Sequence, residues 1–357
     1  MPTPVARDQA QALQMLETWV ASRISPDARV VGDLVVPQGQ GNANETMLFT
    51  VAHDGIEERL VLRIAATSFQ VFLEASLTEQ YHVLDALGSK SLLPVPTVRW
   101  FEDDERYFGA EFLVMDAIDG QVPPDQPSYN CDGTWTAKLT TEQRRQLWSS
   151  AVDALCSIHS DPGVAAAEAV LAAKLHGRNG LAEQIEYWTT FTHWAGGGSA
   201  ILDDALTWLT ANLPANPRTG LSWGDARLEN MMFDQNLDCV AILDWEMASL
   251  GGPLLDLGWW LFCDRFAEIA YETPRLEGLG DRAATCDRWV ARTGVAIDDL
   301  DWYEIFAGYR MSTIIMRMMR KWRDDFGLEL PENFNDVDNA ASRLLTELLA
   351  TARGTRR

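Results

Sequence analysis

The stretch LSWGDARLENMMFDQNLDCVAILDW, residues 221–245, interrupts a long run of helical periodicity in the second part of the chain. It reads as a loop followed by a β-hairpin whose turn spans residues 234–238, because apolar segments flank a cluster of Asp and Asn. Three polar residues stand out in it, Asp225, Asn230 and Asp244. The hairpin would fix the separation between the first two residues and the third.

The spacing of these three residues indicates a chemistry. Asp225 precedes Asn230 by five positions, as in the D-x-x-x-x-N catalytic loop of protein kinases, and Asp244 ends an apolar run. A carboxylate at Asp225 can accept the proton of an attacking hydroxyl. Oxygens of Asn230 and Asp244 suit Mg²⁺ bridging nucleotide phosphates. The competing interpretation is that all three are turn residues beside an exposed hairpin, since Asp and Asn favour turns.

The wider motif is similar to that of a known family. Trp223-Gly224-Asp225 to Asn230, followed by Asp244-Trp245-Glu246 and by the segment GPLLDL at residues 252–257, resembles the aminoglycoside phosphotransferase family, which is related to choline kinases. The resemblance covers roughly residues 30–320 by element order. It looks closest to the branch that includes kinase-like domains fused to acyl-CoA dehydrogenases. It implies an α+β, bilobal, protein-kinase-like fold that uses ATP and Mg²⁺.

The resemblance also implies roles for single residues. It makes Asp225 the catalytic base, Asn230 and Asp244 the metal ligands, and Asp256 a buried structural carboxylate that holds the catalytic loop. One position departs from the family, because Trp223 stands where His is usual. The polar support that a His would give to the loop is therefore missing or replaced by packing of the indole.

A glycine-rich segment in the first part of the chain would cover the phosphates. Gly39-Gln40-Gly41-Asn42 lies between two expected strands and resembles the family's phosphate-covering turn, in which glycines let backbone N–H groups approach the nucleotide. A plain hairpin turn is the competing interpretation. No Walker A sequence occurs, which excludes a P-loop nucleotide fold.

Two further nucleotide contacts follow from the resemblance. Arg63, in the strand LVLRI, stands where the kinase lysine is usual, and its guanidinium would hold the phosphates bidentately; the alternative is an exposed strand arginine. Its partner on the following helix stays open, although Gln80 looks aligned with the family's glutamate. Asp116 and Ile118 occupy the hinge position, where the Asp116 carbonyl and the Ile118 N–H would bind adenine.

The periodicity outside these motifs changes near residue 120. Before it, the sequence predicts a small mixed β-sheet with one main helix, from strands at residues 29–36, 46–53, 59–65, 97–102 and 112–115, helices at 7–22 and 73–87, and an Asp54-Gly55 hairpin turn. After it, helices are expected at residues 181–194, 201–212, 256–268, 282–293, 302–323 and 339–353, and a capping box at Thr140 and Gln143 begins another. We therefore expect a nucleotide-binding lobe at residues 1–118 that ends in the hinge, and a helical lobe with the catalytic loop and acceptor site at 119–357.

Composition limits the partners. The 357 residues carry a net charge of −23, which argues against a general nucleic-acid binder and would suit a cationic small-molecule acceptor. No apolar run reaches membrane-spanning length, and five scattered cysteines suggest neither disulfides nor a zinc site, so a cytoplasmic protein is expected.

The acceptor stays open at this stage. Acidity and family favour an aminoglycoside. A hydroxylated metabolite such as a hydroxyacyl-CoA is favoured by the closest-looking branch and by Arg310, Arg317 and Lys321, which share a face of one expected helix and could receive an anionic group or pair with surface carboxylates. Trp223 and Arg63 also leave room for a nucleotide-binding pseudokinase without catalysis.

Overall fold

A computed structural model describes residues 7–37, 44–66, 70–73, 76–174, 180–327 and 336–355. Its first part is a five-stranded sheet in the order β1-β2-β3-β5-β4, formed by β1 (Arg29–Val35), β2 (Asn44–His53), β3 (Ile56–Ala65), β4 (Val98–Glu102) and β5 (Phe112–Asp116). All four strand pairings are antiparallel, so the expectation of a mixed sheet was wrong. Antiparallel neighbours need only short connections, and the chain supplies them with hairpins such as β2–β3.

The β2–β3 connection is the predicted hairpin turn. Asp54 and Gly55 adopt positive φ angles of 49° and 79°. Two consecutive positive φ angles match the twist of paired strands, which is why Asp-Gly is favoured there. One face of the sheet packs against helix α1 (Gln9–Arg23), where Trp19 is fully buried and meets Phe112 edge to face with ring centroids 5.4 Å apart.

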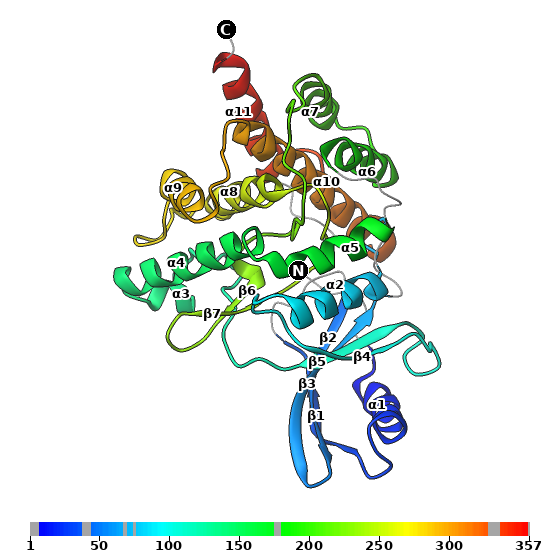
Figure 1. Ribbon diagram of the computed structural model, residues 1–357. Helices are drawn as coiled ribbons and strands as arrows, with labels where there is room; N and C mark the ends of the chain where they lie inside the picture. The colour runs from blue at the N-terminus through cyan, green and yellow to red at the C-terminus, as the bar shows by residue number, and fades with distance from the viewer. Residues whose placement is uncertain are drawn as a thin grey trace.

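Helix α2 (Leu77–Lys90) belongs to both parts of the molecule. It begins after Ser76, whose side chain accepts a hydrogen bond from Glu79 N–H, so it starts later than the expected residue 73. Leu77 packs against the sheet, whereas Val83, Leu84 and Leu87 lie in the large core of the helical lobe. Figure 1 shows α2 lying between the sheet and helix α5 (Ala165–Lys174). The lobe boundary after residue 118 stays a prediction.

The second part is mainly α-helical. Its elements are α3 (Trp135–Lys138), α4 (Thr141–Ile158), α5, α6 (Leu181–Trp194), α7 (Ala200–Ala211), α8 (Pro253–Ala270), α9 (Arg282–Thr293), α10 (Leu300–Phe326) and α11 (Ala340–Thr355), with 3-10 turns η1 (Pro162–Val164) and η2 (Leu228–Asn230). The capping box before α4 is present, with Thr140 and Gln143 bonded reciprocally. The long helix α10 crosses this lobe and packs on α7, α8 and α11 (Figure 1). None of the helices in the described ranges has the length and apolarity needed to cross a bilayer.

The predicted β-hairpin inside the helical lobe is confirmed. Strands β6 (Met231–Phe233) and β7 (Cys239–Ile242) pair antiparallel around a turn in which Asp234 Oδ1 accepts hydrogen bonds from the N–H groups of Asn236 and Asp238. Ile242 N–H also donates to Pro94 O at 2.7 Å. The hairpin is thereby joined to the segment that leads from α2 into β4.

Candidate functional site

Asp225 lies in the loop before η2, and its carboxylate is held by three donors. Trp259 Nε1 donates to Oδ1 at 2.8 Å, and Asn230 Nδ2 donates to Oδ2 at 2.7 Å. Arg227 Nε donates to the same Oδ2 at 3.3 Å. The spacing of five residues therefore brings Asp225 and Asn230 into direct contact. The side chain of Asp225 is 13% exposed, so one edge of the carboxylate remains accessible.

Asp256, near the start of α8, ties down the backbone that precedes Asp225. Its Oδ1 accepts from Ser222 Oγ at 2.7 Å and from Gly224 N–H at 2.8 Å, and its Oδ2 accepts from Trp223 N–H at 2.7 Å. Asp256 is fully buried, so these bonds replace water. His159, for which the sequence suggested no role, places Nε2 3.1 Å from Asp256 Oδ2.

Gly224 cannot be replaced at this turn. Its φ is +93°, and a Cβ there would lie 2.0 Å from Met247 O. Both the positive φ and the close backbone approach require glycine.

Trp223 takes a polar role at the position where the family usually has His. Its indole is fully buried, and Nε1 donates to Leu243 O at 2.8 Å and to Asp244 O at 3.1 Å. The ring also lies beside Trp245, with centroids 6.0 Å apart. The indole thus links the catalytic loop to the segment that carries Asp244.

Asp244 follows β7 and has a φ of +57°, a left-handed conformation that Asp tolerates better than most residues. Its Oδ1 accepts from Arg63 Nη2 at 2.8 Å, which joins the sheet to the helical lobe. Among the described residues, no group of three or more His, Cys, Asp or Glu side chains could hold a metal by itself. A carboxylate and an amide oxygen fit Mg²⁺, which typically binds through one or two protein ligands together with substrate phosphates and water.

Arg63 is a half-buried side chain, and the alternative of an exposed strand arginine is wrong. Its side chain is 16% exposed, and Nη2 also approaches Glu246 Oε2 at 3.5 Å. Burial alone would lower the pKa of Arg63. The carboxylates of Asp244 and Glu246 together raise it by more, so the net shift of the pKa is upward. Burial, together with the nearby Asp244, raises the pKa of Glu246 well above its usual range.

The helix partner of Arg63 left open by the sequence is not found among the ion pairs of the described residues. Glu79 of α2 instead pairs with Lys174 of α5, and Gln80 is buried within α2. Arg63 is held instead by the carboxylates of Asp244 and Glu246 in the helical lobe.

The remaining predicted nucleotide contacts are described only in part. Gly39, Gln40, Gly41 and Asn42 lie outside the described residues. Asp116 ends β5, where its N–H donates to Thr97 O at 3.0 Å and its side chain accepts from Arg99 Nη1 at 2.9 Å. Ile118 follows as the chain leaves the sheet, and adenine binding at Asp116 and Ile118 stays a prediction.

Two partly buried acidic residues, Glu229 of η2 and Asp264 of α8, have raised pKa values. Burial raises the pKa of Glu229 to about 8 and that of Asp264 to about 6. Asp264 accepts from Tyr129 Oη at 2.8 Å and pairs with Arg275 at 2.6 Å. Arg227 pairs with Asp125 at 3.4 Å in addition to Asp225.

The three basic residues of α10 do not form an exposed stripe. Arg310 is 2% exposed and donates from Nη2 to Gly224 O at 2.9 Å. Arg317 lies over the ring of Trp194 at 3.8 Å and donates to Gln70 O, while Lys321 pairs with Asp325. Among the described residues, Lys321 alone of the three forms the expected pair with a carboxylate. Arg227, Trp259 and Arg310 thus belong to the surroundings of Asp225, although the sequence pattern did not place them there.

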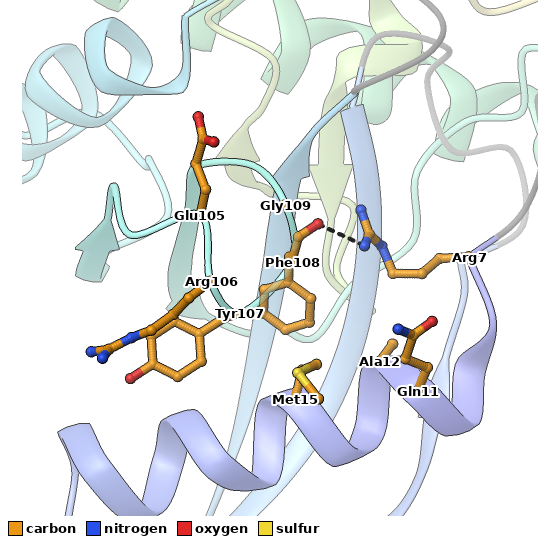
Figure 2. Close-up of a pocket in the computed structure, with 9 residues that line it drawn as sticks. All are labelled: Arg7, Gln11, Ala12, Met15, Glu105, Arg106, Tyr107, Phe108 and Gly109. Atoms are coloured by element: carbon orange, nitrogen blue, oxygen red, sulfur yellow. Dashed lines mark hydrogen bonds between the residues drawn. The ribbon is translucent and has the colours of Figure 1, made fainter.

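A pocket of about 350 Å³ lies elsewhere, between α1 and the loop that precedes β5. Figure 2 shows Arg7 reaching across it to the Phe108 carbonyl, a bond of 2.8 Å. Arg7 is also bound to Glu45, so its guanidinium is already paired. None of the residues predicted for the active site lines this pocket.

Comparisons with known proteins found relatives for most of the chain. The model of the "Phosphotransferase enzyme family" matches residues 35–289. The curated relatives include a probable acyl-CoA dehydrogenase, IBR3, of Arabidopsis thaliana, 28% identical over 62% of this chain and 27% of that protein. They also include acyl-CoA dehydrogenase family member 10 of Mus musculus, 25% identical over 79% and 26%. The chain thus spans about a quarter of the length of these relatives.

Solved structures show the same fold. A candidate aminoglycoside phosphotransferase from Ralstonia eutropha has a TM-score of 0.70 and 23% identity, with coverage of 95% of this chain and 98% of that chain. Choline kinase LicA from Streptococcus pneumoniae has a TM-score of 0.58 and 13% identity, with coverage of 95% and 98%. The expected α+β kinase-like fold is therefore confirmed. Together with the extent of the family match, this shows that the chain belongs to the phosphotransferase enzyme family.

Proposed function

We propose that the protein transfers the γ-phosphoryl group of ATP to a hydroxyl group of a small molecule, with the nucleotide bound between the two lobes. The observation that carries this proposal is the convergence of Asp225, Asn230 and Asp244. Asp225 contacts Asn230 at 2.7 Å, and Asn230 O accepts from the N–H of Leu243, the residue before Asp244, at 2.8 Å. Asp244 is joined in turn to Arg63 of the sheet at 2.8 Å. A related aminoglycoside phosphotransferase has been solved as a ternary complex with AMP-PNP and hygromycin B, which supports a nucleotide and an acceptor in one fold.

Each residue has a distinct role in this proposal. Asp225 accepts the proton of the attacking hydroxyl, and the three donors around it fix the direction of its carboxylate. Asn230 and Asp244 hold Mg²⁺, which supplies neutralisation of phosphate charge when bound. Arg63 of the sheet places a permanent positive charge beside Asp244, where it would bind the phosphates of the nucleotide.

We propose an aminoglycoside or a similar hydroxylated, cationic compound as the acceptor. The net charge of −23 supports a cationic molecule, because the field of the whole chain attracts cations. Solved neighbours described as aminoglycoside phosphotransferases support it as well.

The curated relatives favour a second candidate. Because several carry acyl-CoA dehydrogenase names, a hydroxyacyl-CoA is the alternative acceptor. In either case we infer a cytoplasmic location. All five cysteines are free in the structure, which suits a compartment in which thiols stay reduced.

The test is a panel of acceptors incubated with Mg-ATP and scored for ADP above the acceptor-free background. The panel should include hygromycin B, choline and a short hydroxyacyl-CoA, and Asp225→Asn should be assayed beside the wild-type chain. We expect one class to stimulate ADP release, and we expect the variant to lose about two to four orders of magnitude in turnover. Binding of Mg-ATP without turnover on any hydroxylated acceptor would instead indicate a pseudokinase.

A further inference from the structure

Trp259, on helix α8 of the large core, donates a hydrogen bond to Asp225. Among the described residues, the other side chains that donate to this carboxylate come from the catalytic loop and η2. The side chain is 1% exposed, and Nε1 donates to Asp225 Oδ1 at 2.8 Å. An indole N–H can donate but cannot accept. It therefore favours one orientation of the carboxylate, with Oδ1 turned toward α8 and Oδ2 toward Asn230.

Arg310 on α10 packs against the face of the Trp259 ring. Its guanidinium carbon sits 4.4 Å from the centroid of the Trp259 ring and 5.0 Å from that of Trp188. Its Nη2 donates to the carbonyl of Gly224, the residue before Asp225. A single cation thus contacts both the ring that orients the carboxylate and the backbone that carries it.

The burial of Arg310 is costly and is only partly compensated by the two rings and the Gly224 carbonyl. No carboxylate forms a salt bridge with it among the described residues, and its Nε is buried without a hydrogen-bond partner. Burial lowers the pKa of Arg310 to about 10, although the nearby carboxylates of Asp256 and Asp225 raise it in part, so the group still carries its charge at neutral pH. An apolar side chain of similar volume would stabilise such a position at least as well. Packing alone therefore does not account for an arginine here.

We propose that Trp259 and Arg310 are positioning residues for the phosphotransfer reaction, in which Arg310 fixes the Trp259 ring and the Gly224 carbonyl so that the Trp259 N–H holds Asp225 toward the acceptor hydroxyl. This inference rests on the proposed role of Asp225 as the base. It adds a link from α10, a helix outside the sequence motif, to the catalytic carboxylate.

A purely structural role makes a different prediction. If Trp259 and Arg310 only stabilise the packing of α8 against α10, their substitution lowers the free energy of unfolding and leaves turnover of the folded protein unchanged. If they position Asp225, turnover falls while the KM for ATP stays near that of the wild-type protein, because the nucleotide contacts lie elsewhere.

The decisive variant is Trp259→Phe, which keeps an aromatic ring beneath Arg310 and removes the N–H donor together with part of the indole volume; the matched control loses the same volume. Trp302→Phe on α10 is the matched control, because Trp302 is also buried and donates to a backbone carbonyl, Leu209 O, at 3.0 Å. We expect kcat to fall about tenfold to hundredfold in Trp259→Phe, a loss typical of removing a group that orients a functional residue. Equal kcat in the two variants would overturn the proposal.

Arg310→Met tests the second link. We expect a similar fall in kcat, and we expect the double variant with Trp259→Phe to lose little more than the single variants, because residues that act as a unit are not additive. Multiplicative losses would show that the two side chains act separately and would overturn the link between them. If Arg310→Met does not fold, Trp259→Phe alone decides the role of the indole, and Arg310→Lys replaces it for the second link.

Amide hydrogen exchange separates this inference from the proposed function. The exchange rate over residues 223–227 should rise in Arg310→Met but not in Trp302→Phe, whether or not an acceptor has been found. Unchanged exchange would overturn the anchoring of the loop by Arg310. If exchange rises but no acceptor supports turnover in the wild-type chain, the proposed function fails and the anchoring stands.

Discussion

The substitution Asp256→Asn tests how the catalytic loop is held. Asp256 is fully buried and accepts from Ser222 Oγ, Trp223 N–H and Gly224 N–H at 2.7, 2.7 and 2.8 Å. Asparagine has nearly the same shape but only one acceptor oxygen. If that oxygen keeps the hydrogen bonds from Ser222 Oγ and Gly224 N–H, the amide NH₂ faces the N–H of Trp223. Both of these groups are donors, so no hydrogen bond forms between them.

The expected loss follows from these contacts. One charge-assisted hydrogen bond is lost outright, at about 1.5 to 3 kcal/mol, and two others become neutral, at roughly 0.5 to 1 kcal/mol each. Removing a buried charge offsets part of this loss. We therefore expect the free energy of unfolding to fall by about 2 to 4 kcal/mol, and turnover to fall as well because Asp225 follows the released backbone.

The assay is urea unfolding followed by tryptophan fluorescence, with turnover measured below the transition. Asp153→Asn is the matched control, because Asp153 binds Arg288 and Arg292 with its side chain 32% exposed, and such surface pairs contribute about 0 to 1 kcal/mol. If Asp256→Asn is no less stable than Asp153→Asn, the buried carboxylate does not hold the loop and the reasoning fails.

Three other measurements address nucleotide contacts, pH and thiol reactivity. Arg63→Ala should weaken Mg-ATP binding by about 1.5 to 3 kcal/mol while Arg63→Lys retains most of it, and equal affinities by calorimetry would place Arg63 outside the nucleotide site. Burial raises the pKa of Asp264 to about 6 in the folded chain, so the folded state holds this proton more tightly than the unfolded chain does. Its contribution to the free energy of unfolding should fall by up to about 3 kcal/mol as pH rises from about 4 to above 6, and urea titrations of Asp264→Asn should lack that fall. Burial raises the pKa of Cys156 to about 12, so its thiol should resist alkylation near pH 8 until the protein is unfolded; rapid reaction in the native state would contradict this.

Local sequence signals were enough for most elements of the fold. Helices α6 and α9 have the predicted bounds, because apolar residues recur at helical spacing between clear end signals such as Gly180 and Gly294. Helix α5 was not predicted, since its alanine-rich sequence has little polar contrast between faces. Helix α10 extends beyond the expected residues 302–323 at both ends and stops at Gly327, which has a positive φ of 62°.

The contacts of the candidate site also differ in whether local sequence can predict them. The contact between Asp225 and Asn230 follows from a spacing of five residues, which is local information. The ion pair between Arg63 and Asp244 joins residues 181 positions apart, and only the family resemblance suggested that both lie at the nucleotide. Arg310 shows the limit of periodicity. Helical spacing indicates which residues share a face, but not that α6 and α8 cover that face.

Helix α2 packs in two cores, and this restricts the movement of the two lobes relative to each other. Moving the two lobes apart would remove Val83, Leu84 and Leu87 from the helical core or separate Leu77 from the sheet. Each exposed side chain would cost about 1.5 to 3 kcal/mol, so such a movement would be rare. A movement that leaves α2 in place would bend the sheet between β3 and β5 and would break the ion pairs of Arg63 with Asp244 and Glu246. Under the proposed function, nucleotide exchange would then be limited by bending of the sheet between β3 and β5, and not by the separation of two rigid halves.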